Sequence, residues 1–137
     1  MAKVTALTTT VSVDDSGGVA RDISSSTRSV SFDFPRAEQD VTGLDKSSME
    51  RLLLRGDWTG TLSGIFDPGT NASHDVFKTI GTQAGTLLRT VTIGFSTGGT
   101  VTGECVLTSY QHQIGEDGSH TWSVPFSLAN GTAAVWS

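Results

Sequence analysis

The sequence contains little of what many functional classes require. It has one cysteine, three histidines and three prolines among 137 residues, and only 17% of its residues are charged. The 14 acidic residues outnumber the 9 Lys and Arg, which gives a net charge of -5. A single cysteine excludes an internal disulfide. Gripping nucleic acid requires clustered Lys and Arg, and here the cations are scattered.

Signals for membrane insertion or secretion are also missing. No apolar run approaches the roughly 18 residues that a membrane-spanning helix needs. The residues after Met1 are rich in threonine and lack the apolar segment of a secretory signal. We therefore expect no membrane association, and folding in a cytoplasm.

Catalytic and metal-binding patterns are absent as well. His74, His112 and His120 show no metal-ligand spacing with Cys105 or with each other. His112 and His120 flank a turn and could approach in space, but we interpret them as polar residues beside a hairpin. Cys105 lies on the apolar face of a predicted strand and is expected to be buried. Without a nucleophile elbow, P-loop or dinucleotide fingerprint, we expect no enzyme activity, no cofactor and no metal.

What the sequence does contain is serine, threonine and glycine. There are 17 Ser, 20 Thr and 16 Gly, a composition that favours strands and turns over helices. The 36% of hydrophobic residues suffice for one core. We therefore predict a single domain over residues 1–137.

Alternation of apolar and polar residues predicts about seven or eight strands. Many of them pair an apolar face with a face of Thr and Ser. The residues predicted to share one face are Arg89, Val91, Ile93 and Phe95, then Val101, Gly103, Cys105 and Leu107, and then Trp122, Val124, Phe126 and Leu128, the last set facing inward. The predicted strands cover residues 4–13, 28–34, 57–66, 87–95, 100–110, 121–128 and 132–136, with 19–24 as a further short strand. Asn130-Gly131 indicates a hairpin between the last two.

One short helix is predicted at about residues 72–80. Asn71 or Ser73 can cap it, and Asp75 in its first turn is favoured by the helix dipole. Val76, Phe77 and Ile80 form its apolar stripe.

Residues 35–50 are polar, charged and aperiodic, which predicts a long loop. Ser47 and Glu50 fit a capping box that would open a short helical turn. A strand beginning near Arg51 is favoured instead, because Gly56 would interrupt a helix almost at once.

These elements predict a mainly β fold of two packed antiparallel sheets, a sandwich or small barrel, with one short helix and a long loop. Strand faces and edges without charge invite pairing with neighbouring copies. The composition therefore favours self-assembly.

The order of several motifs resembles the phage tail tube protein (major tail protein) family over about residues 28–136. They are Asp40-Val41-Thr42, Arg55-Gly56-Asp57-Trp58, the strand ending Gly64-Ile65-Phe66-Asp67, the helix from Ser73 to Ile80, and the strand Trp122 to Leu128 before Asn130-Gly131. The resemblance implies a virion protein, made and assembled in the host cytoplasm. It would form stacked hexameric rings, the tail tube through which DNA is ejected.

The resemblance also implies partners and site residues. Besides copies of itself, the partners would be tail terminator, baseplate and tape measure proteins, and DNA would pass through without specific binding. The strands beside the loop would line the lumen through Ser29, Ser31, Asp33, Asp57, Thr59, Thr61 and Ser63, with Glu104 as a further candidate. The loop would make inter-subunit contacts through Arg36, Glu38, Asp40, Asp45, Lys46, Glu50 and Arg51.

Two alternatives remain open at this point. The chain could be a β-sandwich module, immunoglobulin-like or jelly-roll, that decorates a capsid or binds a partner. The polar strand faces could equally be the solvent-exposed faces of an ordinary sandwich.

Overall fold

The structure is a computed structural model that describes residues 9–82, 88–95 and 98–137. Its strands are β1 (Thr10–Asp14), β2 (Ala20–Asp22), β3 (Thr27–Asp33), β4 (Arg36–Asp40), β5 (Arg51–Gly56), β6 (Thr59–Ile65), β7 (Arg89–Gly94), β8 (Thr100–Leu107), β9 (Gln111–Ile114), β10 (His120–Leu128) and β11 (Val135–Trp136). One helix, α1 (Ser73–Phe77), and a 3-10 turn, η2 (Ser24–Ser26), complete the described elements. The predicted strand portions 4–8 and Leu87 lie outside the described residues.

Nine of these strands form one antiparallel sheet, in the order β2-β1-β7-β8-β10-β6-β3, with β11 on β8 and β9 on β10. β8 and β10 pair only from Phe126↔Leu107 to Leu128↔Cys105, so the sheet turns a corner there. The two halves face each other across the core: the Phe32 ring of β3 stacks on Phe95, just after β7, at 6.3 Å. The mainly β fold of antiparallel strands with one short helix is as predicted.

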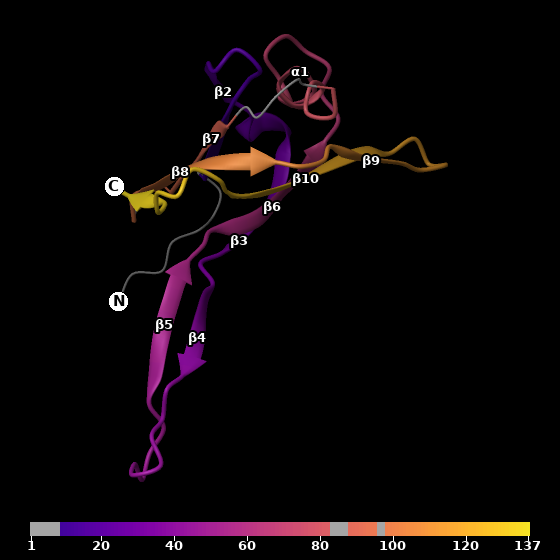
Figure 1. Cartoon of the computed structure of the whole chain (residues 1–137). Helices are drawn as coiled ribbons and strands as arrows, with labels where there is room; N and C mark the ends of the chain where they lie inside the picture. The colour runs from indigo at the N-terminus through magenta and orange to yellow at the C-terminus, as the bar shows by residue number, and fades with distance from the viewer. Residues whose placement is uncertain (1–8, 83–87, 96–97) are drawn as a thin grey trace.

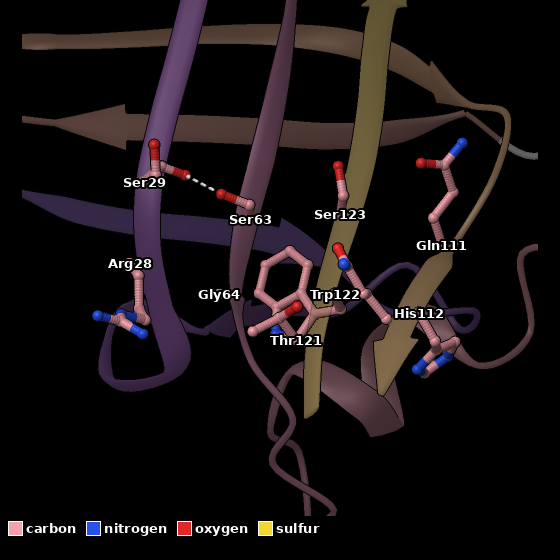
Figure 2. Close-up of a pocket in the computed structure, with 10 residues that line it drawn as sticks. Arg28, Ser29, Ser63, Gly64, Gln111, His112, Thr121, Trp122 and Ser123 are labelled. Atoms are coloured by element: carbon pink, nitrogen blue, oxygen red, sulfur yellow. Dashed lines mark hydrogen bonds between the residues drawn. The ribbon is translucent and has the colours of Figure 1, made fainter. Parts of the chain in front are cut away.

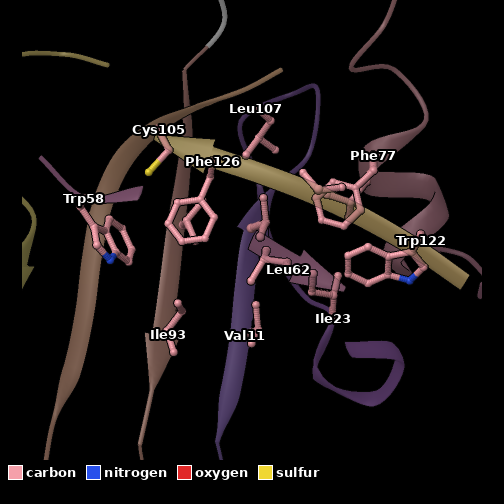
Figure 3. Packing of buried hydrophobic residues seen from close by; sticks show 14 of the residues in the cluster. Val11, Ile23, Trp58, Leu62, Phe77, Ile93, Cys105, Leu107, Trp122 and Phe126 are labelled. Carbon is pink, nitrogen blue, oxygen red and sulfur yellow. The ribbon is translucent and has the colours of Figure 1, made fainter. Parts of the chain in front are cut away.

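The core fills the space between the two halves (Figure 3). Trp58 packs on Phe126 with ring centroids 4.9 Å apart, and Phe77 of the helix packs on Trp122 at 5.1 Å. Trp122 also donates its indole N–H to the Ile65 carbonyl at 2.8 Å. Each large apolar side chain buried in this way stabilises the fold by about 1.5–3 kcal/mol. The body of the molecule therefore has a well-packed interior despite its low apolar content.

The predicted strand faces are confirmed where alternation was clear. In β8, Val101, Gly103, Cys105 and Leu107 are buried, and the residues between them are partly exposed. In β6, a side chain at Gly60 would collide with the Ser31 carbonyl, and one at Gly64 with the Ser26 carbonyl. These two glycines allow β3 to lie close against β6.

Helix α1 is shorter than the predicted 72–80. It ends at Phe77, and the chain continues in turns, with Ile80 N–H donating to the Phe77 carbonyl at 3.0 Å. Val76 and Phe77 are fully buried, as predicted, and Ile80 packs against the core.

A buried arginine holds the helix to the sheet. Arg89 of β7 is 2% exposed and donates to the Val76 carbonyl at 2.5 Å and to Thr79 Oγ1 at 3.0 Å. Burial lowers the pKa of its guanidinium. The Val76 carbonyl lies at the end of α1, where a helix has no internal N–H donor for its carbonyl groups. Arg89 supplies that donor.

The predicted loop 35–50 is wrong in its first part. Residues Arg36–Asp40 form β4, which pairs with β5 as a separate two-stranded sheet. β4 lacks alternation because neither of its faces packs on the core, so no apolar face was required. The strand beginning at Arg51 is confirmed, and no helical turn forms at Ser47.

The predicted hairpin between the strands 121–128 and 132–136 is also wrong. β11 pairs with β8, through Val135↔Thr102 and Trp136↔Val101, and not with β10. It is limited to two residues, shorter than the predicted 132–136. The predicted strand 100–110 ends at Leu107, and residues 111–114 form β9, a strand that was not predicted. The turn predicted between His112 and His120 is confirmed, because β9 pairs with β10 across it. Among the described residues, no helix is long and apolar enough to cross a membrane.

Candidate assembly surfaces

A two-stranded arm projects from the body of the molecule (Figure 1). We define the arm as β4, β5 and the connection 41–50 between them. Every residue of the arm is exposed except Thr42, which is half-buried. The arm meets the body where the Asp57 N–H donates to the Pro35 carbonyl at 3.0 Å. It is therefore held by its base alone.

The arm carries large apolar side chains that nothing in the described chain covers. Their exposed fractions are Val41 41%, Leu44 108%, Met49 55%, Leu52 55%, Leu53 62% and Leu54 42%. Contiguous exposed apolar surface of this kind marks interaction sites on soluble proteins. The inter-subunit residues predicted from the sequence in this segment are all charged, so its apolar contact residues were missed. The Leu52-Leu53-Leu54 run was the feature of the sequence that indicated them.

Both faces of the arm present leucine. Leu53 lies opposite Glu38, and the next pair along places Leu52 opposite Gln39. Successive residues of a strand point to opposite faces. A partner that covers one face alone would thus leave leucine exposed on the other.

Several charged residues of the arm pair within the arm itself. Arg51 contacts Glu38 at 3.5 Å, and Lys46 contacts Glu50 at 3.3 Å. The Arg36 Nε donates to the Leu54 carbonyl at 3.1 Å. Exposed ion pairs of this type contribute only about 0–1 kcal/mol. Their predicted role between subunits stays a prediction.

The connection at the tip is closed by Thr42. Its hydroxyl donates to Asp40 Oδ1 at 2.6 Å and accepts the Glu50 N–H at 2.7 Å. The hydrogen bonds that the Thr42 hydroxyl and the Thr42 N–H donate to Asp40 hold the pKa of its carboxyl below the usual range. The tip therefore has a defined shape, with Leu44 at its outer end.

An exposed aromatic patch lies beside the base of the arm. Phe34 and Trp136 are 40% and 50% exposed, with ring centroids 5.7 Å apart. Phe34 also stacks on the buried Trp58 at 6.0 Å. The patch is thus a continuation of the core onto the surface.

A second surface is the polar face of β3, β6 and β10. Six of the predicted lumen residues form cross-strand pairs on it: Ser29↔Ser63, Ser31↔Thr61 and Asp33↔Thr59. Ser123 and Ser127 of β10 extend these rows. The other two lie apart: Asp57 is at the base of the arm, and Glu104 is on β8, where it accepts a hydrogen bond from the Thr90 hydroxyl.

An arginine that the sequence analysis missed belongs to the same region. A β-bulge between Thr27 and Ser29 leaves Arg28 unpaired in the ladder, and it lines an open groove with Ser29 and Ser63. Figure 2 shows Arg28 at one side of this groove and β9 at the other. Arg28 has no carboxylate partner among the described residues. The surface is therefore neutral to mixed in charge.

The cysteine and the three histidines are the remaining chemically active side chains considered in the sequence. Cys105 is fully buried, as predicted, and burial raises the pKa of its thiol to about 12. The three histidines come together near the start of α1, and His112 and His120 do approach each other. Within the described ranges, no three metal-binding side chains lie close enough to share an ion.

Comparisons with known proteins identify the fold. No family model and no curated protein matches the sequence. The structure is similar to a chain from the tail of an empty gene transfer agent (GTA) particle with C6 symmetry, with a TM-score of 0.72, 18% identity, and coverage of 93% of this chain and 94% of that chain. A chain of the native GTA virion gives a TM-score of 0.71 at 17% identity, covering 93% and 95%.

A third similar structure comes from the baseplate of the anti-feeding prophage (AFP), 6-fold symmetrised. Its TM-score is 0.67 at 10% identity, and the match covers 99% of this chain and 97% of that chain. The chain therefore has the fold of these phage-like tail components over nearly its whole length. The resemblance inferred from the sequence is confirmed at the level of the fold.

Proposed function

We propose that this protein is a structural subunit of a phage-like tail tube, in which six copies form a ring and the rings stack. The observation that carries the proposal is the arm: it exposes leucine on both faces, and none of the described residues covers it. The C6 symmetry of the GTA tail supports the number of copies. The role is structural and needs no catalysis.

The arm supplies the contact between copies. Arm and body are different surfaces, so a contact between the arm of one copy and the body of the next is heterologous. Heterologous contacts generate rings when the rotation closes and helical stacks when it does not. A stack of closed rings therefore needs two different contacts, one within the ring and one between rings, and the two leucine-bearing faces of the arm offer one surface for each.

The polar face of β3, β6 and β10 is the proposed inner wall. DNA must slide past such a wall, and clustered cations would hold its phosphates. Ser29, Ser31, Thr61 and Ser63 offer short, uncharged side chains, and Asp33 adds a negative charge. Arg28 beside them is offset by Asp33, so these residues add no net positive charge to the wall from any copy.

The remaining partners follow from the same role. A tail tube subunit would contact a tail terminator, a baseplate and a tape measure protein, and would reside in the virion after assembly in the host cytoplasm. DNA would pass without specific binding.

Negative-stain electron microscopy tests the proposal. The wild-type chain is expected to give six-fold rings or tubes at high concentration. Leu52→Ser combined with Leu53→Ser should leave a folded monomer that no longer assembles. Val19→Ser is the matched control, because Val19 is exposed to a similar degree, 50%, but lies on the body. Dispersed particles for all three proteins would contradict the proposal and favour the decoration module.

The wall assignment has its own test. Asp33→Lys, in the wall beside Ser31 and Thr61, should still permit assembly but make the tubes retain DNA in a salt-dependent manner. Co-sedimentation of DNA with tubes at low and high salt measures this. A tube map that places these side chains on the outer surface would refute the assignment and leave the assembly proposal standing.

A further inference from the structure

All three histidines of the chain lie in one cluster with Phe66 and Tyr110. The cluster forms where the β9–β10 hairpin meets the start of α1, away from the arm. The Phe66 ring stacks flat on His120, with centroids 4.1 Å apart and planes 6° apart. His74 Nδ1 is engaged with the Tyr110 hydroxyl at 3.2 Å.

The other two histidines face each other directly. His112 Nδ1 lies 2.9 Å from His120 Nε2, on neighbouring strands. One of these nitrogens must be an acceptor with a free lone pair, because two N–H groups cannot point at each other. At this distance the two imidazole nitrogens form a hydrogen bond between the neighbouring strands.

The same distance suits a metal ion. Two metal–nitrogen bonds of about 2.0–2.1 Å that meet at a right angle place their nitrogens about 2.9 Å apart. Right-angled geometry is that of square-planar or octahedral Ni²⁺ and Cu²⁺, whereas a tetrahedral ion needs a wider separation. Binding would turn each ring so that both lone pairs converge, and the shared hydrogen would move to the other nitrogen of its own ring.

The surroundings leave the pair accessible to an ion. His112 is exposed, which gives an ion access. The Phe66 ring stacks on one face of His120 and leaves the edge that carries Nε2 facing His112.

We propose that His112 Nδ1 and His120 Nε2 form a two-histidine site for a divalent transition-metal ion of the Ni²⁺/Cu²⁺ class, with water completing the coordination. An ion there would join the two strands of the β9–β10 hairpin. The proposal does not depend on the assembly role. His74 is not included as a ligand, because no three metal-binding side chains of the described residues lie close enough to share an ion.

Isothermal titration of the untagged chain with NiCl₂ tests this site. Losing even an outer-shell partner of a metal ligand weakens binding about 10- to 100-fold, so His112→Gln and His120→Gln should each weaken Ni²⁺ binding at least about tenfold. His74→Gln, the matched control from the same cluster, should leave the affinity nearly unchanged. Near-UV circular dichroism checks that each variant is folded.

A measurement on the wild-type chain avoids any dependence on variant folding. Imidazole ¹⁵N NMR during titration with substoichiometric paramagnetic Cu²⁺ should broaden the Nδ1 signal of His112 and the Nε2 signal of His120 before either nitrogen signal of His74. Absence of Ni²⁺ binding, equal loss in all three variants, or broadening that begins at other nitrogens would each overturn the assignment.

Discussion

The body and the arm are built from similar residues but are stabilised in opposite ways. Leu62 in β6 is fully buried and packs in a core shared by both halves of the sheet. Leu53 in β5 is 62% exposed on a separate two-stranded sheet that joins the body at its base. An isolated two-stranded hairpin is marginally stable at best. The body thus has a packed core of its own, whereas the arm has none among the described residues.

The largest effect is expected deep in the body. Phe77→Ala removes the ring that packs on Trp122 and should lower the free energy of unfolding by about 3–5 kcal/mol. Urea denaturation followed by tryptophan fluorescence measures this loss. A change below about 1 kcal/mol would mean that the helix is not part of the core.

A matched pair of leucines compares the two regions directly. Leu62→Ala should cost about 2–5 kcal/mol because it leaves a cavity. Leu53→Ala should change the stability of the monomer by no more than about 0.5 kcal/mol, as exposed substitutions do. The same denaturation experiment serves both variants. Equal losses would show that the arm packs on its own body in solution.

An intermediate effect is expected where α1 is held to the sheet. Arg89→Met keeps the length of the side chain but leaves the Val76 carbonyl without its buried donor, at a cost of about 1–3 kcal/mol. In the Arg89→Met variant, native-state hydrogen exchange should accelerate relative to the wild type more in residues 73–80 than in β8. Uniformly faster exchange would instead indicate that Arg89 supports the whole body.

The sequence was sufficient to predict the body because its strands alternate. In β7, β8 and β10 one face is buried, so the period of two is a physical necessity and predicted the inward residues correctly. The same alternation predicted a polar row on β3 and another on β6. In the structure the two rows pair side by side on one face, and they contain the candidate wall residues.

The same reasoning from alternation failed for the arm, because β4 has no buried face. β4 reads Arg-Ala-Glu-Gln-Asp and buries neither face, so nothing forced alternation on it. Its pairing with β5 depends on backbone hydrogen bonds that any residue can make. Arg28 was missed because a bulge, invisible in the pattern, shifts the register of β3. The partner of β11 was misassigned because Asn130-Gly131 specifies a turn but not which strand follows beside which.

The prediction with the smallest expected change in stability compares the chemical reactivity of a cysteine in the body with that of a cysteine in the arm. Cys105 is fully buried with a thiol pKa of about 12, so iodoacetamide should label it only when the body opens. A cysteine placed by Leu44→Cys at the tip should be labelled at once, and protected once copies assemble. Mass spectrometry of both sites in one sample follows the two regions separately. Labelling of Cys105 as rapid as that of the tip would refute the contrast.

The one-sided position of the arm has a consequence for any stack that is joined through it. Each copy offers its arm in one direction and accepts a neighbour's arm elsewhere, so such a stack has two chemically unlike ends. One end displays free arms with bare leucines, and the other displays vacant acceptor surfaces. Growth at the two ends is then unequal in rate, and a protein that caps one end cannot cap the other. The stack acquires a polarity from the shape of a single subunit.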